Sequence, residues 1–291
     1  NLNFIKMYNP EYVLILSGDH IYKMDYSKML RAHIENKADC TIAAIEVPLK
    51  EASRFGILNT NPDGSIYEFE EKPKQPKSTL ASMGVYIFSA EKMYKYLELD
   101  DDDPNSSKDF GKNVLPAMLN AGERMFAYRF EGYWKDVGTI SSLWEANMDL
   151  LGEHPSFDVA DSAWKIHSRN PLAPPEYLGE TAVVTNSMVA LGCEIHGTVE
   201  NSVLSSNVVI EEGATVKDSV IMSGTIIKKG AEVNYSIIDE GVVVNEGAQI
   251  GEDKATAKGI SVLGRGITVG NNAKVAAGAI IDKNIMEGEE A

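Results

Sequence analysis

A fixed interval in the C-terminal part of the chain limits the possible folds more than any other feature. Gly213, Gly230 and Gly247 are 17 residues apart, and each is followed by an alanine. An aliphatic residue stands three positions before and three positions after each of these glycines. A second series has the same period: Ser202-Val203-Leu204, Ser219-Val220-Ile221 and Ser236-Ile237-Ile238. A unit this short cannot bury its apolar side chains alone, so the repeat predicts stacked, identical coils.

Each coil is expected to be triangular, with about 17 or 18 residues and three short strands. Aliphatic side chains would point inward and stack on those of the next coil, while glycine and small residues would occupy the corners. This pattern resembles the left-handed hexapeptide β-helix, an exception to the right-handed crossover rule. A β-sandwich with strands of similar length is the alternative. It would not explain two equal intervals of 17 residues.

The N-terminal half alternates between strand and helix patterns. Tyr12–Leu16 is a short apolar run typical of a buried strand. Asp25 is a plausible N-cap for a helix over 26–34, and Cys40–Val47 is rich in β-branched and small residues. Strand, helix and strand in this order predict a parallel pair joined by a crossover, and hence an α/β sheet.

Further elements are expected along the same half. Asn61-Pro62-Asp63-Gly64 has the turn residues of a hairpin between strands at 56–60 and 65–69. The remaining patterns predict strands at 85–88 and 126–130 and helices at 91–97, 112–119 and 140–151. The expected fold class is therefore an α/β domain, followed by the β-helix.

A proline-rich stretch separates the two halves. Pro171, Pro174 and Pro175 fall within Arg169–Tyr177 and disfavour both helix and central strand. We expect an α/β domain at 1–152, a linker at 153–178, the β-helix at 179–285 and a tail at 286–291.

Composition excludes some classes of partner. The formal net charge of −16 argues against a nucleic-acid or anionic membrane surface. No run of about 18 apolar residues is present, so no membrane-spanning helix is expected. Cys40 and Cys193 lie far apart without metal or redox spacing, which suggests core residues in a cytoplasmic protein.

Three charged segments carry candidate chemistry. Ser17-Gly18-Asp19-His20 follows a buried strand, where ligands of α/β sheets gather, and Asp19 offers hard oxygen ligands for Mg²⁺. Tyr133–Thr139 places aromatic residues beside Asp136 and a Gly-Thr turn. The simpler interpretations are a turn or N-cap role for Asp19 and an N-cap role for Thr139.

The third segment, Glu68–Pro73, ends in Glu71-Lys72-Pro73. Regular alternation would put Phe69 and Glu71 on one face of a strand, and Pro73 should keep Lys72 extended. A fixed lysine can pair with a phosphate, and a neighbouring glutamate can accept hydrogen bonds from sugar hydroxyls. The simpler interpretation is an exposed, charged strand end.

Two weaker candidates remain. In Ala81–Tyr86, Ser82 and a glycine open a strand, which suits close approach of a hexose or a tight strand start. His196 lies in the repeat region, and acyltransferases with such coils use a histidine base. A solvated turn histidine is the simpler interpretation.

Taken in order, six motifs resemble one family. They are Gly-Asp-His-Ile-Tyr, Arg-Phe-Gly-Ile, Phe-Glu-Glu-Lys-Pro, Ala-Ser-Met-Gly-Val-Tyr, Asp-Phe-Gly-Lys and Tyr-Trp-Lys-Asp-Val-Gly-Thr. Together with the β-helix, they resemble the bacterial ADP-glucose pyrophosphorylases, the glucose-1-phosphate adenylyltransferases of glycogen synthesis. The resemblance covers nearly all of the chain. It implies that residues 1–152 form a partial nucleotidyltransferase catalytic domain with a Rossmann-like, mixed sheet, followed by the left-handed β-helix.

The resemblance implies a role for each candidate. Asp19 and Asp136 would hold Mg²⁺ and, with Lys72, form the catalytic group. Glucose 1-phosphate would be bound by Gly56, Glu71, Lys72, Ser82 and Trp134. The reaction would convert ATP and glucose 1-phosphate into ADP-glucose and pyrophosphate. The family also implies a homotetramer under allosteric control.

One departure leaves other functions open. The family's glycine-rich phosphate loop and adenine-contacting segment are expected upstream of Asp19, and neither occurs here. A non-catalytic regulatory subunit is one alternative, although retention of Asp19, Lys72 and Asp136 weighs against it. A nucleotidyltransferase for another nucleotide or sugar phosphate is the other.

Overall fold

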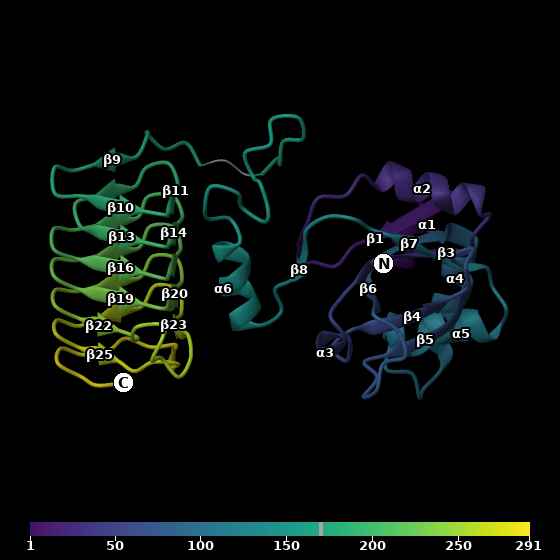
Figure 1. Cartoon of the computed structure of the whole chain (residues 1–291). Helices are drawn as coiled ribbons and strands as arrows, with labels where there is room; N and C mark the ends of the chain where they lie inside the picture. Colours follow the sequence, from purple (N-terminus) through teal and green to yellow (C-terminus); the bar gives the residue numbers. More distant parts are fainter. Residues whose placement is uncertain (169–170) are drawn as a thin grey trace. The chain divides into compact units, whose positions relative to one another are not determined.

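The computed structural model describes residues 1–168 and 171–291, which form two compact units (Figure 1). The first unit is Asn1–Trp134 and the second is Lys135–Ala291. The predicted boundary at 152 lies beyond this division, because helix α6 (Ile140–Met148) packs within the second unit. Arg169 and Asn170, at the start of the predicted hinge, lie outside the described residues.

A mixed sheet forms the centre of the first unit. Its strand order is β5-β4-β6-β3-β7, and β1 pairs with β6 beside this path. The strands are β1 (Tyr12–Ile15), β3 (Cys40–Glu46), β4 (Gly56–Thr60), β5 (Ile66–Glu71), β6 (Leu80–Ser89) and β7 (Met125–Arg129). Short strands β2 (His20–Tyr22) and β8 (Trp134–Asp136) lie outside this sheet. The helical elements are α1 (Leu2–Lys6), α2 (Tyr26–Glu35), α3 (Leu49–Ala52), α4 (Ala90–Asp102), a π-helical turn η1 (Phe110–Val114) and α5 (Leu115–Asn120).

The long strand β6 decides the sheet order. It pairs with β3 along one edge, and with both β4 and β1 along the other, always antiparallel. Strands β1 and β3 therefore run in the same direction, but β6 lies between them. The predicted direct pairing of these two strands is wrong, because a crossover can skip a strand position. Only β3 and β7 form a parallel pair among the described strands of this sheet.

Several local predictions are confirmed. The Asp25 carboxylate accepts the backbone N–H of Ser27 at 3.0 Å and caps α2. Strands β4 and β5 form the predicted hairpin, in which the Asp63 carboxylate accepts the Ser65 N–H at 2.9 Å and Gly64 has φ +83°. The predicted helix over 112–119 begins as a π turn and continues as α5.

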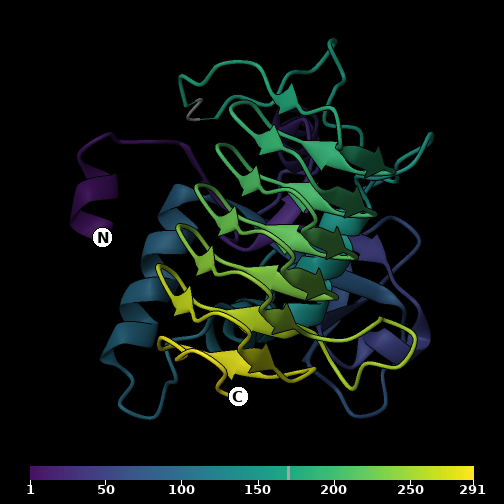
Figure 2. The same ribbon diagram turned by 90° about the vertical axis from the view of Figure 1, so that its left-hand side faces the viewer.

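The second unit is a parallel β-helix whose coils are stacked in three sheets (Figure 2). One sheet contains β10 (Val183–Thr185), β13 (Thr198–Glu200), β16 (Thr215–Lys217), β19 (Glu232–Asn234), β22 (Gln249–Ile250) and β25 (Lys274–Val275). The next contains β11 (Met188–Val189), β14 (Val203–Leu204), β17 (Val220–Ile221), β20 (Ser236–Ile238), β23 (Ser261–Leu263) and β26 (Ile280–Ile281). The last contains β9 (Tyr177–Leu178), β12 (Glu194–Ile195), β15 (Val209–Ile210), β18 (Ile226–Ile227), β21 (Val243–Val244) and β24 (Thr268–Val269).

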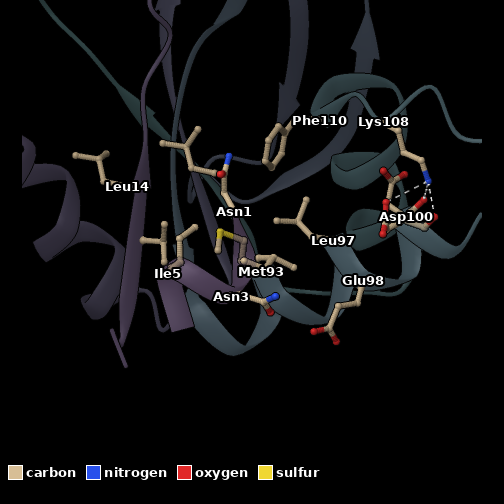
Figure 3. A pocket seen from close by; sticks show the side chains of 14 residues that line it. Asn1, Asn3, Ile5, Leu14, Met93, Leu97, Glu98, Asp100, Lys108 and Phe110 are labelled. Carbon is tan, nitrogen blue, oxygen red and sulfur yellow. Dashed lines mark hydrogen bonds and ion pairs between the residues drawn. The ribbon is translucent and has the colours of Figure 1, made fainter. Parts of the chain in front are cut away.

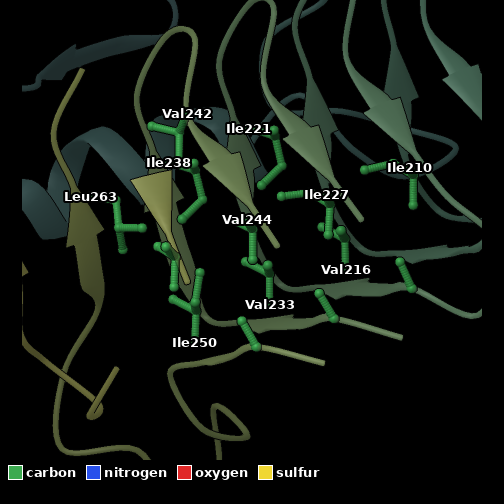
Figure 4. Close-up of a cluster of buried hydrophobic side chains, with 14 of the residues drawn as sticks. Ile210, Val216, Ile221, Ile227, Val233, Ile238, Val242, Val244, Ile250 and Leu263 are labelled. Atoms are coloured by element: carbon green, nitrogen blue, oxygen red, sulfur yellow. The ribbon is translucent and has the colours of Figure 1, made fainter. Parts of the chain in front are cut away.

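The strand register reproduces the sequence repeat. Val203 lies opposite Val220, and Val220 lies opposite Ile237. Inward-facing aliphatic side chains form one continuous buried core, drawn in part in Figure 4. The predicted alternation of aliphatic and glycine positions is therefore confirmed, as expected for a left-handed parallel β-helix. The predicted tail continues the coil, since the N–H groups of Lys274 and Ala276 donate to the carbonyls of Glu289 and Ala291.

Helix α6 covers one side of the β-helix. The buried Trp144 ring packs with Val220, Ile237 and Ile260, and its Nε1–H donates to the Asp218 carbonyl at 2.7 Å. Cys40 and Cys193 are both buried in the cores of their units, as predicted. No helix within 1–168 or 171–291 has the length and apolar character needed to cross a membrane.

Candidate active site

The Glu71 carboxylate lies at the end of the β4–β5 hairpin. Gly56 and Glu71 are directly opposite each other in the antiparallel register. A Cβ atom at Gly56 would lie 2.6 Å from Cζ of Phe69 and 3.0 Å from Oε2 of Glu71. Phe69 and Glu71 therefore share one strand face, as predicted, and Gly56 lets both side chains approach the backbone of β4.

The π turn η1 contacts the same carboxylate from another side. A Cβ atom at Gly111 would lie 2.6 Å from Oε2 of Glu71 and 3.4 Å from Oδ1 of Asp109. Asp109 itself caps the turn, because its carboxylate accepts the Lys112 N–H at 3.0 Å. Glycines on two separate backbone segments therefore border one carboxylate.

Burial and nearby charges act together on Glu71. Desolvation raises the pKa of its half-buried carboxyl above the ordinary value, and the charge of Asp109 acts in the same direction. Lys72 and Lys112 oppose this rise. Such a carboxylate is available to accept hydrogen bonds from a neutral polyhydroxyl ligand.

Lys72 follows the strand with a different backbone from the one predicted. Its φ is +48°, in the left-handed region, so the expectation of an extended residue before Pro73 is wrong. The N–H of Lys72 donates to the Phe55 carbonyl at 3.1 Å, which fixes a tight turn after β5. The Nζ of Lys72 is exposed and lies 3.8 Å from Oε1 of Glu71, in a position to meet an anionic ligand.

Strand β6 brings Ser82 beside Gly56, on the side of β4 that faces away from β5. In the antiparallel pair of β4 and β6, Ile57 lies opposite Ala81. The residue before Ile57 therefore lies opposite the residue after Ala81, which places Ser82 next to Gly56. Ser82 is buried, and its hydroxyl accepts the Gly84 N–H at 3.3 Å. Two further residues near Ser82, Tyr86 and Phe110, were assigned no functional role from the sequence. Their rings stack with centroids 5.8 Å apart, and burial raises the pKa of Tyr86 to about 12.

The loop with Asp19 approaches the same strand at Gly84. A Cβ atom there would lie 3.3 Å from the His20 ring, and Gly84 has φ +66°. The Asp19 carboxylate is exposed and accepts the Ser17 hydroxyl at 2.7 Å, which lowers its pKa. The His20 ring contacts Trp134 edge-on, with centroids 5.2 Å apart. Within the described residues, neither His20 Nδ1 nor Trp134 Nε1 has a hydrogen-bond partner.

Asp136 belongs to the second unit and is held locally. Its carboxylate accepts the Gly138 N–H at 2.8 Å. Lys135 pairs with Glu145 at 2.9 Å and with Asp149 at 3.1 Å. Thr139 caps α6 through a reciprocal pair of hydrogen bonds with Ser142, so the predicted capping role is confirmed.

The carboxylates suit a magnesium ion by their chemistry. Both Asp19 and Asp136 offer hard oxygen ligands, and the lowered pKa of Asp19 keeps that residue ionised. In the described part of the chain, no group of three or more His, Cys, Asp or Glu residues is arranged as a metal site. The assignment of magnesium to these two carboxylates stays a prediction.

His196 offers no catalytic arrangement. Its ring is half-buried beside Gly179 and lies 5.7 Å from the Tyr177 ring, rather than being fully solvated. The structure thus brings Gly56, Glu71 and Ser82 together, with Lys72 beside them. Sequence reasoning assigned no role to Tyr86, Asp109, Phe110 or Gly111, although the Asp-Phe-Gly-Lys motif contained three of them.

A separate cavity of about 770 Å³ opens between α1, β1 and α4 (Figure 3). Its lining is mainly apolar and includes Ile5, Leu14, Met93, Leu97 and Phe110. None of the predicted site residues lines it. Phe110 connects the two regions, because it borders this cavity and also stacks on Tyr86.

Comparison with known proteins agrees with this arrangement. The nucleotidyl transferase family model matches residues 1–153. The chain belongs to the nucleotidyl transferase family. A GlmU-like C-terminal hexapeptide model matches residues 176–269, within the β-helix.

Curated relatives carry a more specific name. Glucose-1-phosphate adenylyltransferase of Clostridium perfringens (strain SM101 / Type A) is 60% identical over 214 residues, covering 74% of this chain and 55% of the relative. The protein of that name from Bacillus thuringiensis subsp. konkukian is 59% identical, covering 74% of this chain and 57% of the relative. The resemblance inferred from the motifs is confirmed, and the chain spans about half the length of these relatives.

Proposed function

We propose that this chain is part of an enzyme that transfers an adenylyl group from ATP to glucose 1-phosphate. The products would be ADP-glucose, the donor for glycogen synthesis, and pyrophosphate. The observation that carries the proposal is the grouping of Gly56, Glu71 and Ser82 beside the exposed amine of Lys72. This grouping combines acceptors for sugar hydroxyls with a cation for the sugar phosphate. The names of the relatives supply the substrate class.

Each residue has a role that follows from its chemistry. Glu71 accepts hydrogen bonds from ring hydroxyls. Gly56 lets the Glu71 side chain lie against β4, and Ser82 lines the hexose site from β6. Lys72 pairs with the phosphate as a point charge. Trp134 presents an aromatic edge and an indole N–H beside the ring of His20.

The chemical step needs alignment more than a base. A phosphate oxygen of glucose 1-phosphate forms a bond to the α-phosphorus of ATP, and the bond from that phosphorus to the bridging oxygen of pyrophosphate breaks. The nucleophile is already anionic, so no proton has to be removed. Asp19 and Asp136 would hold Mg²⁺, which when bound neutralises phosphate charge. Lys72 adds a second positive charge without a proton transfer.

The assay should use the complete protein that contains this chain. We expect pyrophosphate release and ADP-glucose formation from ATP and glucose 1-phosphate, dependent on Mg²⁺. Lys72→Ala should weaken glucose 1-phosphate binding by about tenfold or more, because a charge-assisted contact is lost. Lys77→Ala is the matched control, since Lys77 pairs with Glu68 on the other face of the hairpin. No turnover, or equal activity of the Lys72 and Lys77 variants, would contradict the proposal.

The same assay separates the alternatives. Preference for UTP or dTTP, or for mannose 1-phosphate, would indicate another member of the family. A protein that binds sugar phosphate without turnover would indicate the regulatory subunit. Retention of Asp19, Lys72 and Asp136 favours the enzyme.

We also propose a cytoplasmic homotetramer under allosteric control. The end of the stacked coils offers unpaired strand edges for association between copies. Light scattering of the complete protein would give its mass in solution, and a monomeric mass would contradict this part of the proposal.

A further inference from the structure

Gly111 occupies a position where the backbone of the π turn passes very close to Glu71. A Cβ atom there would lie 2.6 Å from Oε2 and 3.1 Å from Cδ of Glu71. Both distances are below normal van der Waals contact. Any side chain at this position would therefore require the Glu71 carboxylate to move.

The carboxylate is also confined on the side of β4. A Cβ atom at Gly56 would lie 3.0 Å from the same Oε2 atom. Gly56 and Gly111 come from segments far apart in the sequence, and both lie beside one oxygen atom. The shape of the backbone thus sets the direction in which Glu71 points.

The π turn itself is specified by its neighbours. Asp109 caps it, and Phe110 stacks on Tyr86 and lies 5.8 Å from the Phe88 ring. Gly111 is buried at the centre of this arrangement. Single π turns in helices are frequently found at functional sites, where they change the direction of a segment.

We propose that Gly111 is a positioning residue that fixes the Glu71 carboxylate for recognition of the sugar ring. This inference rests on the proposed function, because it assigns a consequence to the same sugar-phosphate site. Gly111 would not touch the ligand. It would act by leaving space that Glu71 occupies in one orientation, which sharpens discrimination between sugar phosphates that differ in one hydroxyl.

The substitution Gly111→Ala distinguishes positioning from folding. The atom that must move is the end of a flexible side chain, and Gly111 is not in the left-handed region. Alanine also has a higher helix propensity than glycine. The variant should therefore keep its melting temperature within a few degrees, while Glu71 is displaced.

Binding of glucose 1-phosphate to the complete protein that contains this chain, measured by calorimetry without ATP, tests the inference without turnover. We expect Gly111→Ala to weaken binding by about tenfold, the effect of losing a hydrogen bond to a charged group. The ratio of affinities for glucose 1-phosphate and galactose 1-phosphate should decrease as well. Asn120→Ala, at an exposed position of the neighbouring helix α5, is the control and should bind as the unaltered chain does.

A double-mutant cycle decides whether the effect passes through Glu71. In a Glu71→Ala background, Gly111→Ala should cause no further loss of affinity, because the displaced carboxylate is gone. If Gly111→Ala lowers the melting temperature, Glu71→Ala should restore it. An equal loss in both backgrounds, or a melting temperature that is not restored, would overturn the inference.

The outcomes also separate this inference from the proposed function. If the unaltered complete protein binds no glucose 1-phosphate, the sugar-phosphate site and the role of Gly111 are both wrong. If it binds, and Glu71→Ala weakens binding while Gly111→Ala does not, the proposed function stands and Gly111 has no positioning role.

Discussion

His33 is buried between α2 and the sheet, where both ring nitrogens contact hydroxyl groups. Nδ1 lies 2.8 Å from the Thr41 hydroxyl and Nε2 lies 3.2 Å from that of Ser89. Burial lowers the pKa of the imidazole below its ordinary value, although the charge of Asp39 acts in the opposite direction. The ring is therefore favoured in its neutral form.

The stability of the first unit should depend on this proton. The pKa of His33 is lower in the folded state than the value of about 6.5 expected in the unfolded state. Between these two pKa values, the unfolded state binds more protons than the folded state does. The free energy of unfolding is therefore highest above about pH 6.5 and decreases as the pH falls through the pKa of the folded state. Urea unfolding between pH 5 and pH 8 measures this slope. In His33→Gln the contribution should vanish, whereas His196→Gln should retain it; a constant difference between His33→Gln and the unaltered chain over this range would contradict the assignment.

Single residues also show where local rules fail. Pro73 predicts an extended Lys72, but the N–H of Lys72 bonds to the Phe55 carbonyl and places the residue at φ +48°. The preference of a residue before proline for an extended backbone was outweighed here by one tertiary hydrogen bond. For Gly111 the difficulty is different, because the Asp-Phe-Gly-Lys motif that contains it is visible in the sequence. The reason for a glycine at this position is its closeness to Glu71, 40 residues earlier, and no local pattern reveals that contact.

At the scale of elements, α6 could be predicted but its packing partner could not. Thr139 and the following apolar residues indicate a capped helix. Leu143, Trp144 and Met148 form an apolar stripe that would suit the core of either unit. Sheet order was hidden for a similar reason, because the neighbours of β1 and β3 depend on β6, a strand much later in the chain.

Trp144 should provide most of the stability of this helix contact. Trp144→Ala should lower the free energy of docking of α6 by about 3–5 kcal/mol, through the loss of aromatic packing and of the bond to the Asp218 carbonyl. Hydrogen exchange of the α6 amides measures the effect, with the central strands of the β-helix as internal reference. Ile140→Ala, at an exposed position of α6, is the control and should change little. Equal protection of α6 in both variants would show that the helix is held by other contacts.

At the scale of the whole molecule, the two units differ in how much of their structure the sequence specifies. In the β-helix, each coil contacts mainly its neighbours, so a short repeat contains nearly all the pairing information. The mixed sheet joins strands from distant parts of the chain, and its candidate site is assembled from β4, the end of β5, β6 and the turn η1. The repeat therefore predicted the register of the coils, whereas the contacts of Tyr86 and Gly111 in the candidate site became visible only in the structure.

A column of buried serines extends along one corner of the β-helix. The Ser202 hydroxyl accepts the Ser219 N–H at 3.0 Å, and the Ser219 hydroxyl accepts the Ser236 N–H at 3.1 Å. Each hydroxyl donates to the carbonyl two residues earlier, at 2.7 Å for Ser219 and Lys217. The residue before each serine has positive φ, as at Asp218 with +48° and Tyr235 with +44°. The serine hydroxyls thus provide acceptors for the N–H groups of Ser219 and Ser236 at this corner of the β-helix.

Ser219→Ala should therefore lower the free energy of unfolding by more than the loss of one small hydroxyl group suggests. It leaves the buried N–H of Ser236 without its acceptor and removes one of the two hydrogen bonds to the Lys217 carbonyl, which still accepts the Tyr235 N–H. The expected loss in the free energy of unfolding is about 1–3 kcal/mol. Because coils are coupled to their neighbours, exchange protection should decrease in the coils containing Ser202 and Ser236 as well. Ser223→Ala removes a hydroxyl in the same coil outside this column and should have little effect on protection. A loss of equal size in Ser223→Ala would mean that serine content matters, rather than the hydrogen-bonded column that links one coil to the next.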